Sequence, residues 1–180
     1  MMPAIPGVYV YIWDFRFKPF AFGHASLEVV RTGEPRVYIS WWPDDARSGK
    51  KISKNIYSAY PVINQTHADV ISLEENPPNH TIFIRGQGIG RPGVNTENII
   101  EFWDALSLES REERKSGPLL PWKTFTLNCS TVVFEALKAG GALTFSGEPR
   151  WSSIPWNPNS VKEFALSVKH NIELAVISGG

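Results

Sequence analysis

Residues 126–141, Thr-Leu-Asn-Cys-Ser-Thr-Val-Val-Phe-Glu-Ala-Leu-Lys-Ala-Gly-Gly, decide the fold predicted for this chain of 180 residues. Their apolar side chains recur at the spacing of one helix face: Val132, Val133, Ala136, Leu137 and Ala139. Polar side chains crowd the front, where they can accept hydrogen bonds from the first backbone N–H groups: Asn128, Ser130 and Thr131. Gly140-Gly141 ends the helix, because glycine adopts the left-handed conformation easily. The stretch therefore predicts a buried amphipathic helix that begins near Cys129.

Cys129 is the only cysteine of the chain, and it has two interpretations. The positive end of a helix dipole favours the thiolate, which is the nucleophilic form of cysteine. Free cysteines are also among the most buried residues, so an inert core thiol is the alternative. A candidate base lies far upstream, at His24. A nucleophile and its base meet in space rather than in sequence, so the long separation does not exclude the pair.

Composition excludes several classes of function. Hydrophobic residues make up 42% and charged residues 20%, which is typical of a globular protein, and the length suits a single domain over residues 1–180. Eighteen basic and eighteen acidic residues cancel without a basic block, so we expect no nucleic-acid partner. A lone cysteine excludes an internal disulfide and a cysteine-built metal site. We expect neither metal nor cofactor, because His67, His80 and His170 also lack metal-ligand spacing.

No stretch reaches the ~18 apolar residues of a transmembrane helix, and no secretory signal is visible at the N-terminus. We therefore expect synthesis in a reducing cytoplasm, with export through a signal-independent machine as an open alternative. The glycine run 86–90 lacks the spacing of a phosphate-binding loop, which makes a nucleotide-binding protein the weakest hypothesis.

The remaining pattern predicts an α+β domain. Strands are expected over residues 8–13, 21–30, 36–42, 81–85, 122–127 and 172–177, and helices over 96–108 and 158–168. Along the second strand, Ala25, Leu27 and Val29 point to one face. His24, Ser26 and Glu28 point to the other. Residues 43–78 show no sustained periodicity and form an irregular insertion, either a binding loop or a surface excursion.

The early Gly23-His24-Ala25-Ser26-Leu27 and the late Asn128-Cys129-Ser130-Thr131-Val132-Val133 together resemble the circularly permuted NlpC/P60 (papain-like) superfamily. Its relatives include the lecithin:retinol acyltransferase type. The resemblance covers residues 20–42 and 126–141, and it implies a central, mostly antiparallel sheet packed on the cysteine helix.

The resemblance also implies the roles of the site residues. Cys129 would be the nucleophile, with its own backbone N–H as an oxyanion donor, and His24 would be the base. Ser40 falls nearest the place of the family's third polar residue, where His, Asn or Gln is more usual. Glu28 shares a strand face with His24, but it lies about 13 Å further along the strand, too far for direct contact.

The function that the resemblance implies is a cysteine hydrolase or acyltransferase. It would act on an amide or acyl bond through a thioester, and its substrate would be a peptidoglycan peptide, a lipid or a protein. Compact chains of this type also resemble bacterial effector toxins, for which a cognate inhibitor protein is a further partner. The alternative is a non-catalytic binding or assembly domain with exposed tryptophans on its partner surface, although Trp13 and Trp103 are expected in the core.

Overall fold

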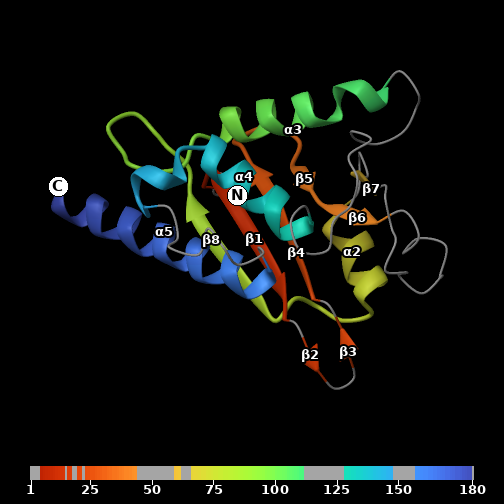
Figure 1. Cartoon of the computed structure of the whole chain (residues 1–180). Helices are drawn as coiled ribbons and strands as arrows, with labels where there is room; N and C mark the ends of the chain where they lie inside the picture. Colours follow the sequence, from red (N-terminus) through yellow and green to blue (C-terminus); the bar gives the residue numbers. More distant parts are fainter. Residues whose placement is uncertain are drawn as a thin grey trace.

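A computed structural model describes residues 5–14, 16–17, 20–21, 23–43, 59–61, 66–111, 128–147 and 157–179. Its centre is a sheet of four antiparallel strands in the order β5-β4-β1-β8 (Figure 1). These strands are β1 (Gly7–Trp13), β4 (His24–Val30), β5 (Val37–Ile39) and β8 (His80–Arg85). Two small antiparallel pairs accompany it: β2 (Arg16–Phe17) with β3 (Phe20–Ala21), and β6 (Trp41–Pro43) with β7 (Ala59–Pro61). The first long strand, β1, lies between β4 and β8 in this sheet.

Three helices pack on one face of this sheet (Figure 1): α3 (Thr96–Arg111), α4 (Cys129–Ala139) and α5 (Pro158–Ser178). The main core lies between them and the sheet. Ala25, Leu27 and Val29 of β4 belong to this core, as the alternation predicts. The predicted α+β class and the packing of the cysteine helix on an antiparallel sheet are therefore present.

Helix α4 forms for the reasons read from its sequence. Asn128 is its N-cap: the side-chain oxygen accepts the Thr131 N–H at 3.1 Å, and the Thr131 hydroxyl accepts the Asn128 N–H at 3.3 Å. At the other end Gly141 has a φ of 81°, a conformation that favours glycine. The apolar stripe is buried except for the half-buried Ala139, and Leu137 is completely inaccessible.

The second and third predicted strands differ from the structure at their ends. The second begins at His24 rather than Ala21, because Gly23 has a φ of 69° and interrupts the extended chain. The third is divided: β5 pairs with β4 in an antiparallel hairpin, whereas Trp41 opens β6 and pairs with Pro61 outside the main sheet. Ser40 lies at the break between β5 and β6.

The predicted strand over residues 172–177 is wrong, because α5 continues to Ser178. Val168 and Ile172 are buried, and Val176 packs against the same core. Their spacing of four continues the helical stripe past the predicted end at residue 168. Helix α3 likewise reaches Arg111 instead of residue 108.

The prediction of an irregular segment over residues 43–78 is wrong for its described part, which contains β7 and helix α2 (His67–Glu74). Thr66 caps α2 in a reciprocal box with Asp69, a signal present in the sequence but overlooked. The predicted strand over residues 122–127 lies outside the described residues.

Trp13 and Trp103 are buried as predicted, and Trp41 is buried with them. The side chains of Trp42, Trp151 and Trp156 lie outside the description. Among the described residues, no helix is long and apolar enough to cross a membrane.

Candidate active site

Cys129 occupies the first position of α4 and is 6% exposed. Its sulfur lies 4.0 Å from the Ser130 hydroxyl, and the backbone N–H groups of Ser130 and of Ala25 are near enough to lower the pKa of the thiol. The contact with Ala25 matters most, because Ala25 follows His24 directly on β4. The start of the cysteine helix therefore meets the start of the histidine strand.

His24 opens β4 and is 1% exposed. Its Nε2 lies 3.0 Å from the Ser40 hydroxyl, which is equally buried. The Trp13 ring lies beside the imidazole, with 5.6 Å between ring centroids. Ser40 is thus in direct contact with His24, whereas the Cys129 sulfur lies near the backbone of Ala25, the residue after His24.

Burial dominates the electrostatics of this site. It raises the pKa of the Cys129 thiol to about 11, although the hydrogen bonds from Ala25 and Ser130 act in the opposite direction. The negative charge of Glu74 at the end of α2 raises this pKa further. Burial also lowers the pKa of His24 to about 3. The predicted favouring of the thiolate by the helix dipole is therefore outweighed, because desolvation penalises a buried charge more strongly than the dipole favours it.

A ladder of polar side chains continues from His24 along the face of the sheet opposite the main core, here called the polar face. Ser26 shares a hydrogen bond with the Tyr38 hydroxyl. The Tyr11 hydroxyl donates to the Glu28 carboxylate at 3.0 Å, and Arg36 pairs with the same oxygen at 2.9 Å. Glu28 thus serves this ladder rather than the imidazole of His24, as its predicted distance implies.

Helix α2 lies against the polar face. The His67 ring stacks on Tyr11 with 3.7 Å between centroids, and Val70 is completely buried against the Tyr11, Trp13 and Tyr38 cluster. No role is predicted for His67 from the sequence, and Trp13 is expected only in the core. The alternation of Tyr9, Tyr11 and Trp13 along β1 was the available signal, since residues two apart share one face of a strand.

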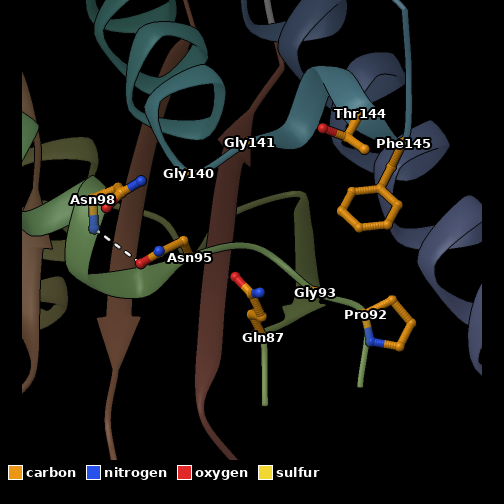
Figure 2. Close-up of a pocket in the computed structure, with 9 residues that line it drawn as sticks. All are labelled: Gln87, Pro92, Gly93, Asn95, Asn98, Gly140, Gly141, Thr144 and Phe145. Carbon is orange, nitrogen blue, oxygen red and sulfur yellow. Dashed lines mark hydrogen bonds between the residues drawn. The ribbon is translucent and has the colours of Figure 1, made fainter. Parts of the chain in front are cut away.

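A pocket of about 280 Å3 lies at the other end of α4 (Figure 2). Its described lining is uncharged and consists of Gln87, Pro92, Gly93, Asn95, Asn98, Gly140, Gly141, Thr144 and Phe145. Since α4 has 11 residues, this pocket is about 15 Å from Cys129 along the helix axis. It is therefore separate from the candidate active site. No group of three potential metal-ligating side chains occurs in the described part of the chain.

Residues 87–176, half of the chain, match the family model described as the IcsB middle domain. The chain belongs to the IcsB middle domain family. No curated protein and no solved structure matches the chain.

The part that matches the IcsB middle domain contains Cys129, but it begins after His24 and Ser40. Membership of the family therefore places the cysteine helix within a known domain type. His24 and Ser40, whose side chains lie 3.0 Å apart, are outside the matched range.

Proposed function

We propose that this chain is a bacterial effector domain with cysteine hydrolase or acyltransferase activity on an amide or acyl bond. The observation that carries the proposal is the packing of α4 on β4, with the Ala25 backbone N–H near enough to the Cys129 sulfur to lower its pKa. This arrangement supports a meeting of nucleophile and base at one end of the sheet. The effector part draws support from the family name, since IcsB is a Shigella effector. A papain-like fold of the permuted NlpC/P60 type belongs to the same proposal.

In the proposed reaction the Cys129 sulfur attacks the substrate carbonyl carbon, and its proton passes to His24. Ser40 bonds to Nε2, so we assign the proton transfer to Nδ1, the other ring nitrogen. The tetrahedral oxyanion takes the backbone N–H of Cys129, since the first N–H groups of a helix have no intrahelical acceptor. The carbonyl bond to the leaving group then breaks, and His24 returns the proton to that group.

The thioester that remains is attacked by water in a hydrolase, or by an amine or hydroxyl in a transferase. The attacking group loses its proton to His24, and the Cys129 thiol is regenerated. Substrates of this chemistry include peptidoglycan peptides, lipids and proteins of a target cell. Export into that cell and a cognate inhibitor protein are parts of the proposal that the chain's own residues do not specify.

Alkylation by iodoacetamide tests the pair, because Cys129 is the only cysteine. We expect His24→Ala to slow labelling near pH 7 by about a hundredfold, the lower end of the range for removing a general base. His80→Ala is the matched control, since His80 pairs with Asp14 at the start of β8, and β1 separates β8 from the histidine strand β4. Equal labelling of the two variants would refute the pair. Trapping an acyl group on the Cys129 peptide by mass spectrometry would then identify the substrate class.

A second candidate function is a non-catalytic binding or assembly domain. It is favoured by the burial of both groups, which keeps the thiol protonated and the imidazole neutral near pH 7. In that case labelling would be slow at neutral pH, rise only toward pH 11 and be indifferent to His24→Ala.

A further inference from the structure

The candidate site is closed. Cys129 is 6% exposed, and His24 and Ser40 are each 1% exposed. A sulfur attacks a carbonyl carbon only when the two atoms are in contact, so a substrate cannot react with this arrangement as it stands. Some element next to the site must move before any reaction at Cys129.

Among the described residues, helix α2 is held by less packing than α4. Val70 is the only completely buried side chain among those described for α2. By contrast, α4 has seven buried residues. Elements with few buried apolar contacts open at the lowest free-energy cost, so α2 is expected to move before α4 or the central sheet does.

The contacts of α2 hold it against the sheet more weakly at its first turn than beyond its last turn. At its first turn, the His67 ring lies parallel to Tyr11, with 13° between the planes. The Nδ1 atom of His67 is buried without a hydrogen-bond partner among the described residues, which weakens the closed position. Beyond the last turn, the Trp13 indole donates to the Asn76 carbonyl at 2.8 Å and anchors the chain.

Trp13 and Glu74 connect α2 to the candidate site. Trp13 lies 5.6 Å from the His24 ring and 6.2 Å from the His67 ring, measured between centroids. Glu74, in the last turn of α2, is close enough to Cys129 for its charge to disfavour the thiolate. The closed position of α2 therefore covers the histidine side of the site, and the charge of Glu74 adds to the burial that raises the pKa of the thiol.

We propose that α2 is a cap on the candidate active site, latched by the His67–Tyr11 stack and hinged at the Trp13–Asn76 hydrogen bond. Opening exposes the polar face beside His24 and withdraws Glu74 from the cysteine. This inference rests on the proposed function in one respect, that Cys129 is the reacting group. The movement of α2 is tested separately, because labelling measures access to the Cys129 sulfur whether or not the protein has that activity.

The test compares two replacements of His67 in the full chain at one fixed pH. His67→Ala removes the stack, whereas His67→Phe keeps a ring on Tyr11 and removes the unpartnered nitrogen. We expect His67→Ala to accelerate iodoacetamide labelling of Cys129 about threefold to tenfold, the range for loss of one aromatic pair. We expect His67→Phe to label no faster than the wild type. His170→Ala, on the exposed side of α5, is the control and should leave the rate unchanged.

Hydrogen exchange of the α2 amides, measured on the same proteins, should accelerate in His67→Ala while α4 stays protected. The proposal is overturned if His67→Ala leaves labelling unchanged, if His67→Phe accelerates it equally, or if α2 and α4 lose protection together. Because His24 is intact in all three variants, these outcomes are independent of the test of the Cys129–His24 pair.

Discussion

Acidification from pH 7 to pH 5 should destabilise the protein through His24. Burial lowers the pKa of His24 in the folded state to about 3, whereas the unfolded chain has the usual value of about 6.5. Between these values the unfolded chain binds more protons, so the free energy of unfolding falls as the pH falls below 6.5. At pH 5, about 1.5 units below the unfolded value, this loss amounts to ~2 kcal/mol, since each unit corresponds to ~1.4 kcal/mol.

Urea denaturation at pH 7 and pH 5 measures this difference. The informative variant is His24→Gln, which keeps a polar group for the Ser40 hydroxyl and does not titrate in this range. Between pH 7 and pH 5, we expect the free energy of unfolding of the variant to fall by ~2 kcal/mol less than that of the wild type. His170→Gln, at an exposed position of α5, should retain the wild-type pH dependence.

The comparison isolates His24 because other titrating groups are common to both proteins. Burial also lowers the pKa of His67, so its contribution has the same sign and cancels between wild type and variant. If His24→Gln and the wild type lose equal stability on acidification, His24 titrates normally in the folded protein. The description of His24 as a buried neutral imidazole would then be wrong.

Three substitutions test other parts of the argument. Ser40→Ala leaves the buried Nε2 of His24 without its hydroxyl partner and should cost about 1–3 kcal/mol of unfolding free energy in urea titrations, with the loss absent in a His24→Ala background. Asn128→Ala removes the capping box of α4 and should cost ~1 kcal/mol by the same measurement, whereas Asn128→Asp should retain most of it. Leu137→Ala opens a cavity at a completely buried position and should cost about 2–5 kcal/mol, unless the neighbouring side chains collapse into the space.

The cysteine helix α4 shows how much of the fold can be predicted from local sequence pattern. Its polar front, apolar stripe and terminal glycines predict α4 almost to the residue, because each signal acts within a few residues of the chain. The same local reasoning overlooked the capping box of α2, and it ended α5 too early because β-branched residues near Ile172 also suit a strand. Burial against the main core decided in favour of the helix.

The sequence by itself determined the elements that carry the candidate site: an alternating strand that begins near His24, a capped helix that begins at Cys129, and a serine at the end of the neighbouring strand. Only the tertiary structure decided that Ser40 meets Nε2 of His24, that the Ala25 backbone meets the sulfur, and that α2 lies over the polar face. It also decided the ionisation of the site. The helix dipole is a local property of the chain, whereas the desolvation that outweighs it exists only once sheet and helices have closed around the thiol.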